Sequence, residues 1–233
     1  MMIEKLKKYG QDFVASKLES LTGEARAKLE KQLSEIDFDE LDELIRDYVL
    51  KKPVTEIPSD LAPAPFFPFP AKDDAQKEYY EKARKEGERL LSEGKVAMLV
   101  VAGGQGTRLG FDGPKGTYPI TPVKHKTLFQ YFAETIKRVS EKYGRPLHWF
   151  IMTSELNDRR TREFFKENSY FGLGEKNITF FTQGTMPAIS YEGKLLMGAA
   201  DSLALSPNGH GGTLLALKKS GALDEMKKNG VEY

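Results

Sequence analysis

Several kinds of residue are scarce in this 233-residue chain, and each scarcity excludes a class of site. There is no cysteine, which excludes disulfides, thiol nucleophiles and thiolate metal sites. Three histidines are too few to favour a His-rich metal centre. Lys and Arg total 35 against 34 for Asp and Glu, so no overall charge excess points to nucleic acid or to an anionic membrane. Any basic site must therefore be local.

Long hydrophobic runs are also missing. The first ten residues are charged and lack a hydrophobic core of signal-peptide length, and no uninterrupted apolar run reaches membrane-spanning length. We therefore expect a soluble protein of the cytoplasm, with neither a membrane nor nucleic acid as its partner. The sequence leaves the oligomeric state open.

The composition changes twice along the chain and predicts three segments. Residues 1–50 place apolar side chains at helical spacing, which predicts two or three amphipathic helices and a packing or interaction role. Breaks or caps are predicted at Thr22–Gly23 and Asp37–Asp39. Six prolines fall within residues 51–70, so residues 51–72 are predicted to be an extended connector. Residues 73–233 form the third segment.

Strand patterns and helix patterns alternate in that third segment. Strands separated by helices imply βαβ units, hence a mostly parallel sheet flanked by helices, of Rossmann-like α/β class. Ligands of such sheets bind beyond the carboxyl ends of the strands. The predicted strands are 96–101, 147–152 and 177–181, with a hairpin of two short strands at 188–191 and 194–197; the predicted helices begin near 73, 127, 157, 213 and 223.

A glycine-rich loop follows the first of these strands. It reads A-G-G-Q-G-T-R-L-G and continues, after three residues, with P-K. Glycines allow backbone conformations that other residues avoid and allow a ligand to come close, while arginine and lysine bring fixed positive charge. This combination suits a phosphate. The residues concerned are Gly103, Gly104, Gly106, Gly110, Arg108 and Lys115.

Two commoner glycine motifs do not fit this loop. A dinucleotide-binding G-x-G-x-x-G that starts at Gly104 would need glycine at position 109, where the chain has Leu109. A P-loop would need G-x-x-x-x-G-K-[ST], which neither Gly94-Lys95 nor Gly193-Lys194 completes. What fits is the spacing of the loop itself, which puts the Arg108 guanidinium and the Lys115 ammonium beside backbone donors. Such a group can hold a triphosphate, and its two cations can counter the negative charge that moves to a departing pyrophosphate.

The same loop resembles the signature of the nucleotide-sugar pyrophosphorylases, specifically the uridylyltransferases that make UDP-sugars from UTP and a sugar 1-phosphate. Further segments resemble the eukaryotic-type UDP-N-acetylhexosamine pyrophosphorylases, and together they cover nearly the whole chain. They are Y-G-Q at 9–11, I-D-F at 36–38, H-K-T-L-F-Q at 125–130, M-T-S at 152–154, Y-F-G-L at 170–173 and F-F-T-Q-G-T-M-P-A at 180–188.

This resemblance implies roles for particular residues and a reaction. A sugar 1-phosphate oxygen would attack the α-phosphorus of UTP in line, with Mg²⁺ assisting, and would release pyrophosphate without a covalent enzyme intermediate. By position, Arg108 and Lys115 would act on the phosphates and Gln183 would pair with the uracil. The backbone of Val101, Ala102, Gly103, Gly104 and Gly106 would surround the nucleotide, and Gly209 and His210 would lie near the nucleoside and the incoming sugar phosphate.

Two departures from that family pattern leave questions open. The second glycine loop reads P-N-G-H-G-G, whereas acetylhexosamine enzymes have P-D-G-N-G-G; the G-H-G is more like UDP-glucose and broad-specificity enzymes. The sugar is therefore undetermined, with N-acetylglucosamine 1-phosphate preferred. By the resemblance, residues 73–233 would be the N-terminal part of the nucleotidyltransferase catalytic domain, and the metal-binding aspartate would lie beyond Tyr233. We therefore expect a fragment that has an incomplete sheet, holds no metal ligand and turns over weakly or not at all.

Two other classes of function stay open at this point. One is a non-catalytic nucleotide-binding or assembly module whose helical arm makes contacts. The other is a dinucleotide-dependent oxidoreductase, which Leu109 disfavours.

Overall fold

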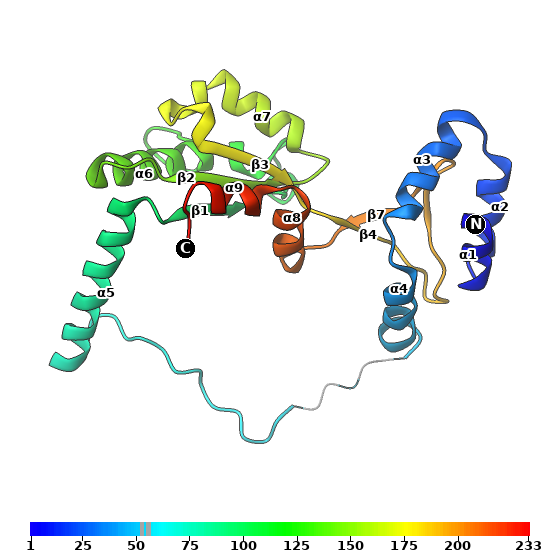
Figure 1. The fold of residues 1–233 in the computed structure, drawn as a ribbon, viewed down its shortest axis with the longest axis horizontal. Helices are drawn as coiled ribbons and strands as arrows, with labels where there is room; N and C mark the ends of the chain where they lie inside the picture. The colour runs from blue at the N-terminus through cyan, green and yellow to red at the C-terminus, as the bar shows by residue number, and fades with distance from the viewer. Residues whose placement is uncertain (52–53, 55–56) are drawn as a thin grey trace. The chain divides into compact units, whose positions relative to one another are not determined.

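The computed structural model describes residues 1–51, 54 and 57–233, and the chain divides into two compact units (Figure 1). The first unit comprises Met1–Ala64 and Thr185–Pro207. The second comprises Pro65–Gly184 and Asn208–Tyr233. Part of the predicted connector, residues 52, 53, 55 and 56, lies outside the described residues. No helix in the described ranges is long and apolar enough to cross a bilayer.

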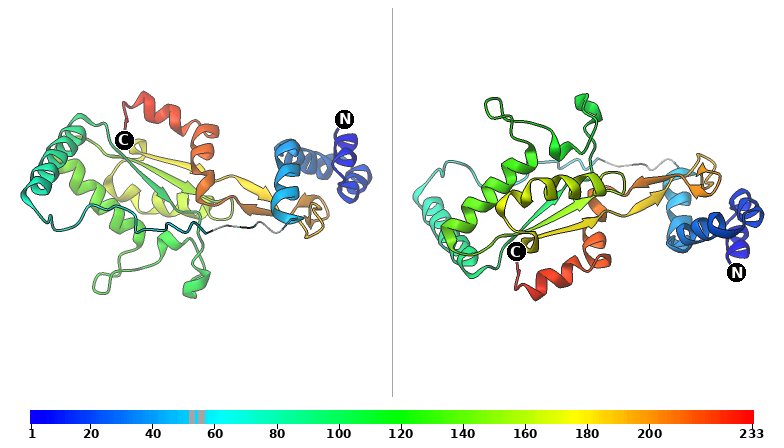
Figure 2. Two further views of the ribbon diagram at one scale, coloured as in Figure 1. Left: turned by 90° about the horizontal axis from the view of Figure 1, so that it is seen from below. Right: turned by 90° about the horizontal axis from the view of Figure 1, so that it is seen from above.

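A three-stranded parallel sheet forms the centre of the second unit (Figure 2). Its strands are β1 (Ala97–Val101), β2 (His148–Thr153) and β3 (Ile178–Thr182), in the order β1-β2-β3. All three predicted strands are present to within one residue at each end, and the predicted parallel α/β fold is confirmed. In this register Val101 lies opposite Met152, so the strands end at the same edge of the sheet.

Helices cover both faces of this sheet because β2 alternates two sets of apolar side chains. Trp149 packs with Phe129 and Phe165 on the face covered by α6 and α7, while Phe150 packs with Leu217 on the face of α8 and α9 (Figure 1). The helices of this unit are α5 (Asp74–Glu93), α6 (Leu128–Tyr143), α7 (Asp158–Glu167), α8 (Thr213–Lys219) and α9 (Ala222–Lys228), close to the predicted positions.

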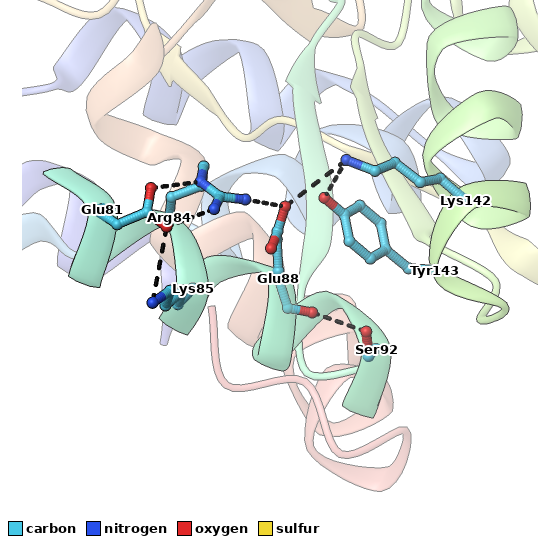
Figure 3. Close-up of polar contacts among 7 residues, drawn as sticks. All are labelled: Glu81, Arg84, Lys85, Glu88, Ser92, Lys142 and Tyr143. Carbon is cyan, nitrogen blue, oxygen red and sulfur yellow. Dashed lines mark hydrogen bonds and ion pairs between the residues drawn. The ribbon is translucent and has the colours of Figure 1, made fainter.

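The exposed side of α5 is a ladder of ion pairs (Figure 3). The guanidinium of Arg84 lies between Glu81, at 2.6 Å, and Glu88, at 2.8 Å. The hydrogen bond from Arg84 holds the pKa of the Glu81 carboxyl below its usual range. Lys142 of α6 reaches Glu88 at 3.8 Å. Since these side chains are exposed, the ladder joins α5 to α6 without contributing much stability.

The outer edge of β1 is paired only where the strand begins. The Ala97 N–H donates to the carbonyl of Tyr233 at 2.9 Å, and the Tyr233 N–H donates to the carbonyl of Lys95 at 3.1 Å. Further along, Leu99 and Val101 are 42% and 39% exposed. Among the described residues this part of the edge has no neighbouring strand.

The first unit packs short helices around an apolar core. Residues 1–51 form more helices than the two or three predicted, because Gly10 adopts a φ of 68° and ends the first of them early. The predicted breaks at Thr22–Gly23 and Asp37–Asp39 are confirmed. The helices are α1 (Met2–Lys8), α2 (Asp12–Ser20), α3 (Gly23–Ser34), α4 (Phe38–Leu44) and the π-helical η1 (Ile45–Val49).

Residues 185–207 pack with these helices. The amide of Gln11, which is 4% exposed, donates to the carbonyl of Gly193 at 3.0 Å and accepts from the Leu195 N–H at 2.8 Å. This segment, an excursion of the chain from the second unit, contains two antiparallel strand pairs. They are β4 (Thr185–Pro187) with β7 (Leu205–Pro207) and β5 (Met197–Ala199) with β6 (Ser202–Leu203).

The hairpin predicted at 188–191 and 194–197 is present as a turn with paired arms, although the arms form a single bridge instead of regular strands. Gly193, with a φ of 76°, lies in the turn, and Ile189 and Leu195 form the bridge. The Leu196 N–H also donates to the Ala188 carbonyl at 3.0 Å. Ala204 pairs with both arms, since it accepts from the Ala188 N–H and donates to the Leu196 carbonyl, each at 2.8 Å.

His148, the first residue of β2, yields a test of the packing on this sheet. Its side chain is 12% exposed, its Nε2 lies 3.0 Å from the Thr179 hydroxyl, and burial lowers its pKa below 6.5 although Glu225 at 3.6 Å opposes this. A pKa that is lower in the folded state favours unfolding in acid, so His148 should reduce stability progressively as pH falls below about 6.5. NMR titration should find its pKa below 6.5, and urea unfolding of His148→Gln should be less sensitive to pH between 7.5 and 5.5. A pKa at or above 6.5 would contradict this assignment.

Candidate nucleotide-binding site

Three segments that are distant in the sequence meet at the carboxyl edge of the sheet. The glycine loop leaves β1 at Ala102, and Gln183 directly follows β3. The Gln183 side chain is 9% exposed and lies against Gly103, 3.0 Å from the position of a Cβ atom there. The Asn208 N–H donates to the Gly184 carbonyl at 3.1 Å, which brings the second glycine loop beside Gln183. The convergence predicted from the topology is present.

The glycine loop is closed by two backbone hydrogen bonds. The Gly106 N–H donates to Gly113 at 2.8 Å, and the Lys115 N–H donates to Gly104 at 3.0 Å. Its glycines are needed mainly for close packing, since of the four predicted to need unusual conformations only Gly110 has a positive φ, at 67°. A Cβ on Gly106 would lie 2.7 Å from the Phe111 ring.

Consecutive backbone donors in this loop are free. The Ala102 N–H still donates to Met152, at 2.7 Å, but the next three N–H groups, those of Gly103, Gly104 and Gln105, have no hydrogen-bond partner among the residues that the structure describes. Successive unpaired amides of this kind form a binding site for an anion. They lie at the sheet edge where ligands of parallel sheets bind.

The two cations of the loop are also free. Arg108 lies in the 3₁₀ turn η2 (Thr107–Leu109) and Lys115 begins η3 (Lys115–Thr117). Both side chains are exposed, and neither has an ion-pair partner in the described part of the chain. The Lys115 Nζ lies 3.9 Å from the position of a Cβ on Gly104, so its ammonium stands over the free amides. Positive charge therefore lies close to the run of free amides.

The second glycine loop is held by an asparagine side chain. Gly209 has a φ of 68°, and His210 begins the turn η6 (His210–Gly212) with its ring exposed. The Asn208 side chain packs so closely on Gly184 and Gly212 that a Cβ at either would lie 2.8 Å and 2.1 Å from it, respectively. Asn208 therefore brings the start of this loop beside the segment that carries Gln183.

Asn157 belongs to this site, whereas the sequence predicted only a helix that begins near residue 157. It occupies the N-cap position of α7, but its side chain makes no cap hydrogen bond and instead reaches the backbone of the glycine loop. The sequence signal for this role was its place just beyond the carboxyl end of β2, where ligands of parallel sheets bind.

A magnesium site is not formed by the described residues. No group of three or more His, Asp or Glu side chains among them could hold a metal ion.

Comparison with known families agrees with this geometry. Residues 62–233 match the family model described as UTP–glucose-1-phosphate uridylyltransferase. The chain is 38% identical, over its whole length, to UDP-N-acetylglucosamine diphosphorylase 2 of Arabidopsis thaliana, and 36% identical, over 96% of its length, to a probable UDP-N-acetylglucosamine pyrophosphorylase of Dictyostelium discoideum. It spans 48% of each, about half the length of these relatives.

A solved structure shows the same arrangement of elements. The crystal structure of the uridine diphosphate N-acetylglucosamine pyrophosphorylase from Trypanosoma brucei, in complex with an inhibitor, superposes with a TM-score of 0.72 at 28% identity. The match covers 98% of the present chain and 49% of that protein. The helices of the first unit and the sheet of the second are therefore both features that the two proteins share.

Proposed function

The chain belongs to the UTP–glucose-1-phosphate uridylyltransferase family, and from this premise we propose that it binds UTP at the glycine loop and serves the transfer of its uridylyl group to a sugar 1-phosphate. The observation that carries the proposal is the run of three free amides, from Gly103 to Gln105, beneath the Lys115 ammonium. A triphosphate supplies the negative oxygens that such a cradle stabilises.

Roles follow from the positions of the side chains. The free amides and Lys115 hold phosphate oxygens, and Arg108 adds charge that stabilises the departing pyrophosphate. Gln183, held against Gly103, presents its amide to the uracil, and Gly209 with His210 borders the position of the nucleoside and the incoming sugar phosphate. Attack by the sugar phosphate oxygen on the α-phosphorus requires positioning more than a protein nucleophile. Mg²⁺ is expected to arrive with the phosphates, where it would neutralise their charge.

The preferred sugar is N-acetylglucosamine 1-phosphate. The Arabidopsis and Dictyostelium relatives are named for UDP-N-acetylglucosamine. Glucose 1-phosphate, or several sugars, is the second candidate, since His210 stands in a G-H-G sequence that resembles UDP-glucose enzymes. The cytoplasmic location expected from the sequence remains a prediction.

Pyrophosphate release is the test of this proposal. UTP would be supplied with the 1-phosphates of N-acetylglucosamine, glucose and galactose, both to the 233-residue chain and to any longer protein that carries it. A longer protein is expected to release pyrophosphate when N-acetylglucosamine 1-phosphate is supplied. The 233-residue chain is expected to release little or none. UTP binding without release by every form would favour the non-catalytic module. Binding of a nicotinamide cofactor instead of UTP would contradict the proposal.

Gln183→Ala should separate recognition of the base from recognition of the phosphates. The variant removes the amide proposed to pair with uracil and leaves the loop amides in place. Its affinities for uridine and for UTP should fall by a similar factor, about tenfold for the lost hydrogen bonds. NMR titration with each ligand measures both. Unchanged affinity for uridine would remove Gln183 from the base site.

A further inference from the structure

Asn157 is buried beneath the glycine loop and is bonded to it twice. Its side chain is 0% exposed. Its Nδ2 donates to the carbonyl of Ala102 at 3.0 Å and to that of Gly104 at 3.3 Å, and its Oδ1 accepts from the Ser154 N–H at 2.9 Å. Two partners only accept and one only donates, so these partners determine the orientation of the amide. The side chain thereby joins the loop after β1 to the loop after β2.

This bonding determines which way the free amides point. In a trans peptide the carbonyl and the following N–H point in opposite directions. With the Ala102 carbonyl directed at Asn157, the Gly103 N–H is directed away from it. The Gly104 carbonyl likewise turns the Gln105 N–H away from Asn157. Two of the three free donors are therefore directed away from Asn157, which holds the Ala102 carbonyl and shares the Gly104 carbonyl with the Lys115 N–H.

We propose that Asn157 is a positioning residue that aims the phosphate-binding amides of the glycine loop, an inference that rests on the proposed binding of UTP. Asparagine suits the task, because it donates twice while accepting once, within one planar group. An aspartate of the same shape donates nothing and would set a carboxylate against two carbonyl oxygens. Because the Asn157 side chain is fully buried, it offers no surface to a ligand and would act only through the backbone that it holds.

The test compares two asparagines at opposite ends of α7. Asn157→Asp removes both donors, and Asn168→Asp is the matched control, because the Asn168 Nδ2 donates to the Phe164 carbonyl at 2.8 Å on the exposed end of the same helix. Without nucleotide, the NMR amide signals of Gly103 and Gln105 should shift in Asn157→Asp and stay in place in Asn168→Asp. With ligand, Asn157→Asp should lower the affinity for UTP about tenfold while leaving that for uridine unchanged.

Each outcome has one meaning. Unshifted loop amides in folded Asn157→Asp, or an unchanged ratio of UTP to uridine affinity, would overturn the positioning role. An equal loss for both ligands would indicate a general structural role and would overturn it as well. Failure of the unaltered chain to bind UTP would contradict the proposed function, yet the amide signals would still decide whether Asn157 orients the loop. Should Asn157→Asp not fold, Asn157→Ala, which buries no charge, gives the same comparisons.

Discussion

Replacing both Arg108 and Lys115 with alanine is expected to lower the affinity for UTP by about a hundredfold or more, since a hydrogen bond to a charged group contributes about 1.5–3 kcal/mol. Both side chains are exposed and without ion-pair partners in the described part of the chain, so they stabilise nothing in the unliganded protein. The thermal unfolding temperature should therefore remain unchanged. Calorimetric titration with UTP, beside a thermal melt, measures both quantities.

The matched control for this pair is the double replacement of Arg84 and Lys142. These cations are equally exposed but lie in the ion-pair ladder between α5 and α6, outside the loop (Figure 3). Their loss should leave UTP binding as it is, which distinguishes a local phosphate site from attraction by overall charge. In a longer protein that is active, Arg108→Ala alone should abolish pyrophosphate release, and near-normal release would refute its assigned role.

Gly116→Ala should destabilise the second unit by about 2 kcal/mol or more. A Cβ there would stand 2.1 Å from the ring of Phe129, which is itself 1% exposed and packs edge to face with Trp149 and Phe165. That ring cannot move aside without displacing its neighbours, because protein interiors are close-packed. Urea unfolding should show a lower midpoint with an unchanged slope.

Gly87→Ala is the opposite case and serves as its control. Gly87 lies within α5, and a Cβ there would meet nothing within 4 Å. The exchange should stabilise the protein by roughly 0.5–1 kcal/mol, because alanine loses less conformational entropy in a helix. Equal effects of the two substitutions would show that Gly116 is not confined by Phe129.

The parallel sheet was predictable because its strands are short apolar runs separated by helices of ordinary length. Once β1 and β3 are parallel neighbours of β2, their carboxyl ends must share an edge, and this brings Gln183 to the glycine loop before any coordinates are known. The loop itself was recognisable from its glycines and its two cations. These conclusions depend on periodicity and connectivity, which a sequence displays directly.

The features that were not predicted depend on contacts between residues that are far apart in the sequence. The side chain of Asn157 could have capped α7, and nothing near it in the sequence shows that Ala102 and Gly104 offer it carbonyls instead. The packing of residues 185–207 with the N-terminal helices depends on Gln11 and Leu195, which are 184 positions apart. Local patterns carry no information on such pairings.

The excursion from Thr185 to Pro207 also has a consequence for the order of folding. It leaves and re-enters the second unit at Gly184 and Asn208, which are joined by a backbone hydrogen bond. Closing a loop costs entropy that grows only with the logarithm of its length, about 0.6 kcal/mol for each doubling. The sheet joins strands that follow one another along the chain, whereas Leu195 and Leu203, which complete the core of the first unit, are far in sequence from its helices. During synthesis, therefore, the N-terminal helices can pack with one another early, but their core is completed only after residues 185–207 have been made.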